Sequence, residues 1–136
     1  MLQVLATVAA FNMICSGTEV FSLAPVERPY DASYRIDLAR GQWCEGGCDT
    51  AFPLASVAGD RIVLRDGPPP RSATDRRAIR GGLWQTVEID RASGALFDER
   101  TNGATAVVIR TTRRGQCRET DFTGLPDAAP EADSEI

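Results

Sequence analysis

Four cysteines are the residues of this 136-residue chain best suited to do chemistry. Cys44 and Cys48 are separated by Glu-Gly-Gly, whereas Cys15 and Cys117 lie near opposite ends of the chain. A four-cysteine zinc site usually presents two close pairs, and a redox-active pair is usually Cys-x-x-Cys at the start of a helix. The spacing therefore favours two structural disulfides over a metal site or a redox pair, with three pairings possible.

The pairing of Cys15 with Cys117 and of Cys44 with Cys48 fits the sequence best. The two glycines inside the close pair let the chain reverse, so that its Cα atoms can approach to the roughly 4.4–6.8 Å that a bridge requires. Loop entropy gives the small ring about 2 kcal/mol and a loop of about a hundred residues nearer 4.7 kcal/mol. The longer bridge would tie the first strand to the last, as suits a sheet that closes on itself.

The composition excludes several classes of function. The chain has no histidine, the side chain most used for acid–base catalysis and for binding metals near neutral pH. Its net charge of −4 comes from an acidic end, so the preceding residues are neutral and lack an electrostatic footprint for nucleic acid. We expect no cofactor, no metal and no nucleic-acid partner.

The ends of the chain differ from its middle. Residues 1–10, MLQVLATVAA, resemble an apolar leader in which Val8 and Ala10 suit a signal-peptidase site, although a retained first strand or helix is the alternative. The apolar stretch is too short for the ~20 residues of a transmembrane span. Residues 126–136 predict a disordered acidic tail. A single β-domain is expected over residues 11–125.

Short strand-like segments recur between turn signals along this domain. The segments are residues 11–15, 20–23, 33–38, 51–57, 61–65, 83–90, 95–99, 104–111 and 115–119. Tyr34, Ile36 and Leu38 alternate with polar residues, which is typical of a half-buried strand. The spacing predicts an all-β fold: a small, disulfide-stapled antiparallel β-barrel or sandwich of about eight short strands.

Local signals add three expectations. Ser16-Gly17-Thr18 should turn or bulge the chain after the first strand. Pro53 should place its strand at a sheet edge. The tryptophans Trp43 and Trp84 should lie in the core rather than form a ligand-stacking platform.

An internal repeat predicts two hairpins. Residues 35–43, RIDLARGQW, and 88–96, EIDRASGAL, share the frame Ile-Asp-x-Ala-x-Gly. Asp37 and Asp90 are placed to accept hydrogen bonds from turn amides, and Gly41 and Gly94 to adopt a positive φ.

A long Pro- and Arg-rich connection covers residues 67–82, GPPPRSATDRRAIRGG. Loops of this length in compact domains are often functional. We interpret it as a candidate anion-contact loop, with a solvated loop as the alternative. Its candidate contacts are Arg71, Arg76, Arg77 and Arg80.

Catalysis has little support in the sequence. Nucleophilic catalysis by serine or cysteine normally needs a nearby base, usually histidine. The acid pairs Glu88 with Asp90 and Asp98 with Glu99 arise readily by chance among 19 carboxylates, and solvated strand faces explain them. We therefore assign no catalytic residue and expect no enzyme.

Several short motifs, taken together, carry a resemblance. Cys-Ser-Gly-Thr from Cys15, then YRIDL, WCEGGC, IDRASG and RGQC before FTGLP resemble small uncharacterised exported proteins of alphaproteobacteria. This resemblance implies a periplasmic or secreted location. The segment Ser93-Gly94-Ala95-Leu96-Phe97 is also similar to the inhibitory loop of small β-barrel inhibitors of c-type lysozyme, with Phe97 in place of an aromatic hydroxyl. That likeness makes Ser93, Gly94 and Phe97 a candidate inhibitory hairpin.

The sequence leads to one hypothesis and two alternatives. The hypothesis is a non-enzymatic exported β-domain that binds an unknown protein or small ligand of the cell envelope. One alternative is a periplasmic inhibitor of a lysozyme-like hydrolase. The other is a small hydrolase with two carboxylates roughly 5–9.5 Å apart in a cleft.

Overall fold

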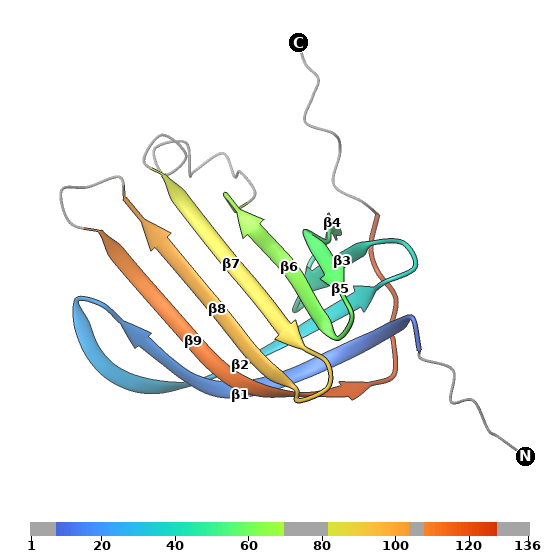
Figure 1. Cartoon of the computed structure of the whole chain (residues 1–136), viewed down its shortest axis with the longest axis horizontal. Helices are drawn as coiled ribbons and strands as arrows, with labels where there is room; N and C mark the ends of the chain where they lie inside the picture. Colours follow the sequence, from blue (N-terminus) through green and yellow to red (C-terminus); the bar gives the residue numbers. More distant parts are fainter. Residues whose placement is uncertain (1–7, 70–81, 104–107, 128–136) are drawn as a thin grey trace, which may run out of the picture.

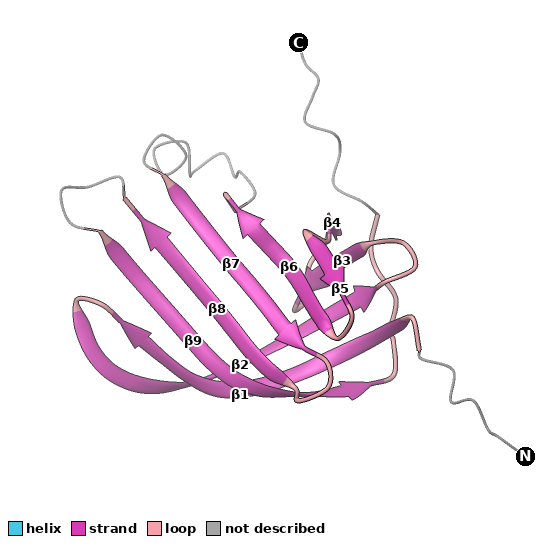
Figure 2. Cartoon of the chain, viewed as in Figure 1, coloured by secondary structure: helices cyan, strands magenta, loops and turns pink. Residues whose placement is uncertain are grey.

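The computed structural model describes residues 8–69, 82–103 and 108–127 and places nine strands in one antiparallel sheet (Figure 2). The strands are β1 (Ala10–Phe21), β2 (Ala24–Asp37), β3 (Gln42–Glu45), β4 (Phe52–Pro53), β5 (Ser56–Ala58), β6 (Arg61–Gly67), β7 (Leu83–Asp90), β8 (Ala95–Asn102) and β9 (Ile109–Thr120). In the order β4-β3-β2-β1-β9-β8-β7-β6-β5, the sheet curls into a half-barrel (Figure 1). The predicted all-β fold is confirmed. Within the described ranges no helix is long and apolar enough to cross a membrane.

The two ends of the sheet are consecutive in the chain. Only Leu54 and Ala55 separate β4 from β5, although these strands lie at opposite ends of the strand order. The Leu54 amide donates to the carbonyl of Gly41 at 2.8 Å, and the Ala55 amide donates to that of Val63 at 2.9 Å. One short segment thus hydrogen-bonds both ends of the sheet and holds it curled. The predicted edge position of Pro53 is confirmed, because β4 is an end strand.

The expected turn at Ser16-Gly17-Thr18 is wrong. Strand β1 runs straight through these residues and pairs with β2 and β9 on its two sides. Gly17 lies opposite Gly115, and a Cβ on Gly17 would lie 2.0 Å from the carbonyl oxygen of Arg114. A glycine is therefore needed here because the two strands approach closely, not because the chain turns.

The core occupies the inner face of the curled sheet. The alternation predicted for the second long strand is confirmed, because Tyr34 and Ile36 have no exposed surface. Trp43 packs with Tyr34 and is buried as expected. Trp84 is 47% exposed, so its predicted core position is wrong. It lies on the outer face of β7, where its Nε1 donates to Oδ1 of Asp66 at 3.1 Å.

Both predicted hairpins are present. In the first, Asp37 Oδ1 accepts a hydrogen bond from a turn amide at 3.1 Å. In the second, Asp90 Oδ1 accepts two, at 2.9 and 3.0 Å. Gly41 has a φ of 66° and Gly94 a φ of 79°, the left-handed region that glycine adopts without strain.

The predicted disulfide pairing is also confirmed. Cys15 and Cys117 lie directly opposite each other on β1 and β9, with Cα atoms 4.0 Å apart. Cys44 bridges to Cys48 across the loop that follows β3, with Cα atoms 6.1 Å apart. The longer bridge therefore joins the first strand to the last, and no cysteine is free.

Candidate functional site on the inner face

The inner face of the half-barrel divides into an apolar part and a charged part. Side chains alternate along a strand, so Leu96, Asp98 and Arg100 of β8 share the inner face. Leu96 belongs to the apolar core, and the two residues after it in this row are charged. We call the charged part the polar inner cluster. Its members are Glu19, Tyr30, Tyr34, Glu45, Arg65, Gln85, Asp98, Arg100 and Arg113.

Asp98 lies at the centre of this cluster with no exposed surface. Its Oδ1 accepts a hydrogen bond from Nε2 of Gln85 at 3.3 Å, and its Oδ2 lies 3.5 Å from Nη1 of Arg113. Burying a carboxylate is costly unless it is paired. Arg113 provides the charge, but Oδ2 has no hydrogen-bond partner within the described part of the chain. One buried oxygen is thus left ready to accept a hydrogen bond.

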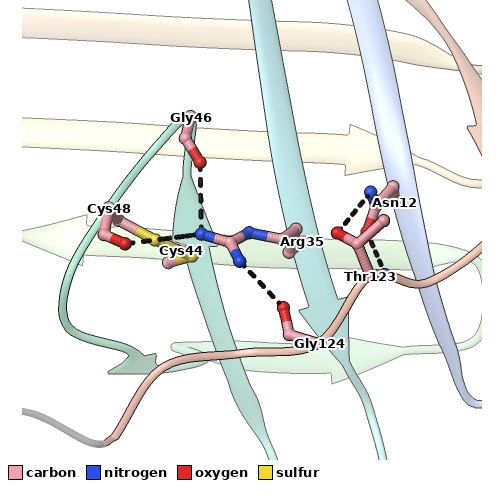
Figure 3. The surroundings of a disulfide bond; sticks show 7 residues. All are labelled: Asn12, Arg35, Cys44, Gly46, Cys48, Thr123 and Gly124. Atoms are coloured by element: carbon pink, nitrogen blue, oxygen red, sulfur yellow. Dashed lines mark hydrogen bonds between the residues drawn. A yellow bond between two sulfur atoms is a disulfide. The ribbon is translucent and has the colours of Figure 1, made fainter.

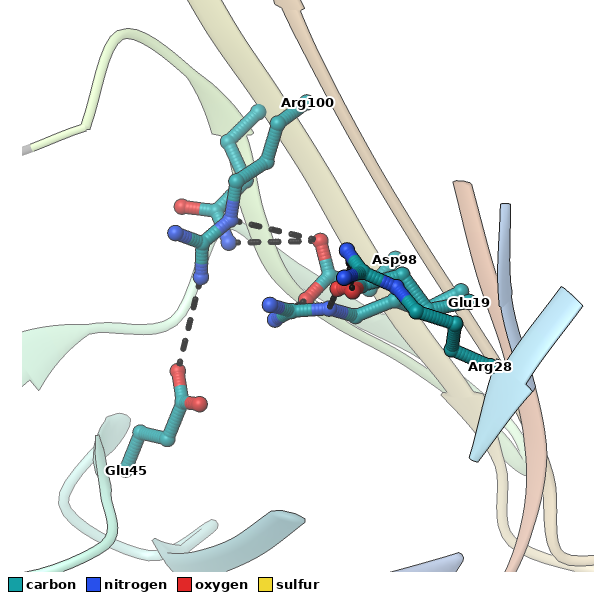
Figure 4. Close-up of polar contacts among 7 residues, drawn as sticks. Glu19, Arg28, Glu45, Asp98 and Arg100 are labelled. Carbon is teal, nitrogen blue, oxygen red and sulfur yellow. Dashed lines mark hydrogen bonds and ion pairs between the residues drawn. The ribbon is translucent and has the colours of Figure 1, made fainter. Parts of the chain in front are cut away.

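Arg113 links Asp98 to a second carboxylate. Glu19 on β1, Arg113 on β9 and Asp98 on β8 lie directly opposite one another across three adjacent strands. Arg113 Nε donates to Oε1 of Glu19 at 2.6 Å, and this hydrogen bond holds the Glu19 pKa below its ordinary value. Burial alone would lower the Arg113 pKa, but Glu19 and Asp98 outweigh it, so that pKa is raised. Figure 4 shows Glu19 and Asp98 together, with Arg28 next to Glu19.

Arg100 is held more loosely than Arg113. Its Nε lies 3.8 Å from Oδ1 of Asp98, and its Nη2 lies 3.9 Å from Oε1 of Glu45 (Figure 4). Both distances are too long for a hydrogen bond, which a separation of about 3.6 Å already excludes. The side chain is 45% exposed. Arg100 therefore presents a positive charge and N–H donors that these two carboxylates do not occupy.

Arg65, unlike Arg100, has no carboxylate at ion-pair distance among the described residues. Its Nη1 donates to Oε1 of Gln85 at 3.0 Å, and its guanidinium carbon lies 4.7 Å from the ring centre of Trp43 and 5.1 Å from that of Phe52. Burial, and then the positive charge of Arg100, lower the Arg65 pKa. Arg65 and Arg100 thus lie in one region, and no carboxylate is within hydrogen-bonding distance of either guanidinium.

Two tyrosine hydroxyls complete the cluster. The hydroxyls of Tyr30 and Tyr34 are buried and have no hydrogen-bond partner within the described ranges. Burial, and then the charge of Asp98, raise the pKa of Tyr30 to about 12. Burial, and then Glu45 and Asp98, raise the pKa of Tyr34 above its ordinary value. Both hydroxyls therefore remain protonated donors. Buried polar atoms normally have partners, so these hydroxyls and Asp98 Oδ2 are three buried atoms whose hydrogen-bonding capacity the described residues leave unused.

The outer face offers a groove but no comparable chemistry. The groove measures about 780 Å³, and its lining includes Ile14, Ser16, Asp31, Ser33 and Arg118. None of its described lining side chains has a buried polar atom without a partner. Among the described residues, the buried polar atoms without partners therefore gather on the inner face.

The sequence also names four arginines of a candidate anion-contact loop. Arg71, Arg76, Arg77 and Arg80 fall outside the described residues.

The candidate hairpin does not form one continuous surface. Ser93 is exposed in the turn between β7 and β8, as the inhibitor hypothesis requires, but Gly94 is buried. A Cβ on Gly94 would lie 2.4 Å from the Cys117 carbonyl oxygen. Phe97 is half-buried beneath Arg114, whose guanidinium carbon lies 4.9 Å from the ring centre.

The polar inner cluster is not apparent from the sequence, in which Asp98 and Glu99 resemble a chance acid pair. The alternation of Leu96, Asp98 and Arg100 is the signal that points this carboxylate inward. In the described ranges no three His, Cys, Asp or Glu side chains lie close enough to hold a metal ion. Comparison of the chain with protein families, curated proteins and solved structures finds no match in any of the three.

Proposed function

We propose that this protein is a non-enzymatic exported β-domain, periplasmic or secreted, that binds a small hydroxylated anion on the inner face of its half-barrel. The observation that carries the proposal is the meeting, in one cluster, of three buried polar atoms without described partners and two guanidiniums that no carboxylate hydrogen-bonds. Two disulfides support an oxidising compartment outside the cytosol.

The chemistry of the cluster selects the ligand class. A carboxylate or phosphate between Arg65 and Arg100 would accept hydrogen bonds from planar guanidiniums, which match such anions in a bidentate manner. A ligand hydroxyl would donate to Oδ2 of Asp98 and accept from the hydroxyl of Tyr34. A simple anion such as acetate meets only the arginines and is repelled by Asp98. A neutral sugar can bind only the Asp98 and Tyr34 oxygens. A sugar acid or sugar phosphate can bind these oxygens and the two guanidiniums.

The charge states in the cluster favour binding over acid–base chemistry. A general acid needs a carboxyl pKa raised toward the working pH. The Glu19 pKa moves the other way, because Arg113 donates a hydrogen bond to its carboxylate.

Calorimetric titration with four probes tests the proposal. Galacturonate and glucose 6-phosphate carry both groups, galactose carries only hydroxyls, and acetate carries only the charge. We expect at least one of the two hydroxylated anions to bind more tightly than galactose and acetate, and Arg100→Gln to weaken it about tenfold, the effect of about 1.4 kcal/mol.

The control is Arg61→Gln, the same substitution at an arginine that pairs with Glu88 at 2.6 Å outside the cluster. Its affinity should match that of the unmodified protein. Absence of binding by both hydroxylated anions would contradict the proposal, as would equal affinity in the Arg100 and Arg61 variants.

One observation favours a second candidate function, inhibition of a lysozyme-like hydrolase. The exposed turn at Ser93 is rigid, because Asp90 Oδ1 accepts two amide hydrogen bonds and Ser93 Oγ accepts a third from Ala95 at 3.1 Å. This hypothesis predicts that the protein inhibits a c-type lysozyme and that Ser93→Arg abolishes the inhibition. A lysozyme with full activity in a molar excess of the protein would exclude it for that enzyme class.

A further inference from the structure

A guanidinium lies directly against one of the two disulfides. Arg35 Nη2 is 3.0 Å from Sγ of Cys48, and the same nitrogen is 3.4 Å from the Cys48 carbonyl and 3.3 Å from that of Gly46 (Figure 3). Its Nη1 donates to the carbonyl of Gly124 at 3.0 Å. All these partners are neutral, and no carboxylate within the described ranges lies at ion-pair distance from Arg35. The full positive charge is therefore available to a sulfur anion.

The two disulfides differ in how much they constrain the chain, although each joins a buried cysteine to a half-buried one. Cys15 and Cys117 are 102 residues apart in sequence and join strands in the middle of the sheet. Cys44 and Cys48 are only 4 residues apart, and the loop between them is largely exposed. A small ring constrains the unfolded chain least, so opening it costs the folded state least. Reduction should therefore affect the Cys44–Cys48 bridge first.

Within this bridge the two sulfurs are not equivalent. Cys44 has no exposed surface, whereas Cys48 is half-buried, so an incoming thiol reaches Cys48. Arg35 lies directly opposite Cys44 on the paired strands β2 and β3 while its Nη2 contacts Cys48. One guanidinium thus stands beside both sulfurs.

We propose that the Cys44–Cys48 bridge is a site of thiol–disulfide exchange with small thiols, at which Arg35 stabilises the protein thiolates. A thiolate attacks Sγ of Cys48, a mixed disulfide forms there, and the electron pair of the broken bond stays on Cys44 as a thiolate. A second thiolate attacks the mixed disulfide, which releases the oxidised small thiol and leaves a thiolate on Cys48. Two small thiolates supply the two electrons. A neighbouring cation favours such thiolates. This inference does not depend on the proposed ligand.

Glutathione is the probe. The intact protein is incubated in glutathione redox buffers, quenched in acid, alkylated and mapped by mass spectrometry. We expect glutathione on Cys48 first, while the bridge between Cys15 and Cys117 stays intact. Arg35→Gln should slow the exchange about tenfold. Arg40→Gln is the matched control, since Arg40 is exposed on the nearby hairpin and its side chain has no contact with the bridge.

The direction of the effect separates the proposal from a purely structural role. If Arg35 only tethers the loop, Arg35→Gln loosens it and exchange becomes faster, which would overturn the proposal. Arg35→Lys keeps the charge, so its exchange should stay near that of the unmodified protein; a rate as slow as that of the Gln variant would also overturn it. In the reduced protein, the pH midpoint for alkylation of Cys48 should lie below the ordinary thiol value of about 8.5 and rise in Arg35→Gln.

Discussion

Arg113 Nη1 lies 3.5 Å from Oδ2 of Asp98, a carboxylate with no exposed surface, while its Nε donates to Glu19. Arg113 thus bridges two carboxylates in one row across β1, β9 and β8. The charges of this row are paired, but Oδ2 of Asp98 has no hydrogen-bond partner among the described residues. The remaining hydrogen-bonding capacity is what the proposed ligand uses.

Removing Arg113 should destabilise the protein strongly. Arg113→Gln leaves Asp98 and Glu19 without their shared cation, and breaking a buried pair from one side costs about 3–5 kcal/mol. Urea unfolding at neutral pH measures the loss. Arg28→Gln is the control, because Arg28 pairs with Glu19 at 3.4 Å from a side chain that is 68% exposed, and such pairs contribute about 0–1 kcal/mol. Equal effects of the two substitutions would contradict the assignment.

Tyr34→Phe should separate stability from binding. The substitution removes a buried hydroxyl that has no described partner, so the free energy of unfolding should be unchanged or rise by up to about 1 kcal/mol. Affinity for the hydroxylated anion should fall, because the ligand hydroxyl loses its donor. Urea unfolding and calorimetry on the same preparation measure both quantities. A loss of stability in the ligand-free protein would show that the hydroxyl already has a partner.

The tyrosines also give the protein a pH signature. Tyr30 and Tyr34 are the only tyrosines in the chain, so tyrosinate absorbance reports on the cluster alone. The Tyr30 pKa is raised from 10.0 to about 12, chiefly by burial. The unfolded state therefore loses its tyrosine protons first. The stability contributed by the protonated tyrosine is complete below about pH 10 and is lost between about pH 10 and 12.

Absorbance titration of native and urea-unfolded protein measures this difference. The native titration should lie at higher pH than the unfolded one. Tyr30→Phe should reduce the loss of stability above pH 10. Coinciding native and unfolded titrations would show that solvent reaches both hydroxyls.

The close pairing of β1 with β9 should not tolerate a side chain at Gly17. A Cβ there would lie 2.0 Å from the backbone oxygen of Arg114, so the strands must separate. Gly17→Ala should lower the free energy of unfolding by at least about 1–3 kcal/mol, the usual range for overpacking. Gly47→Ala is the control, since its added Cβ meets nothing within 4 Å. Equal stability of the two variants, measured by urea unfolding, would contradict the close approach of β1 and β9 at Gly17.

Local signals in the sequence predicted much of the fold. The alternation at Tyr34 and Ile36 identified the inner face of β2, and the repeated Ile-Asp frame located both hairpin turns because Asp37 and Asp90 act on amides only a few residues away. In the sequence Gly17 resembles a turn residue. A glycine is needed there because Gly115, which lies far along the chain, pairs with it at close range. Its role depends on strand pairing, which no local pattern records.

The candidate site was harder to predict for the same reason. Glu19, Asp98 and Arg113 are ordinary charged residues in three separate segments. They form one row only through the registers of β1, β9 and β8. For Trp84 the local pattern was the better guide. Its aromatic side chain favours the core, but the alternation of buried and exposed positions along β7 places it on the outer face.

The most direct test of the proposed inner-face site is a nuclear magnetic resonance titration of the arginine Nε–Hε signals with galacturonate and, separately, glucose 6-phosphate. We predict that at least one of them shifts the signals of Arg65 and Arg100 in a saturable manner, while those of Arg28 and Arg61 stay in place. Unmoved signals for Arg65 and Arg100 with both probes, or shifts confined to Arg28 and Arg61, would contradict the assignment of the ligand to the polar inner cluster.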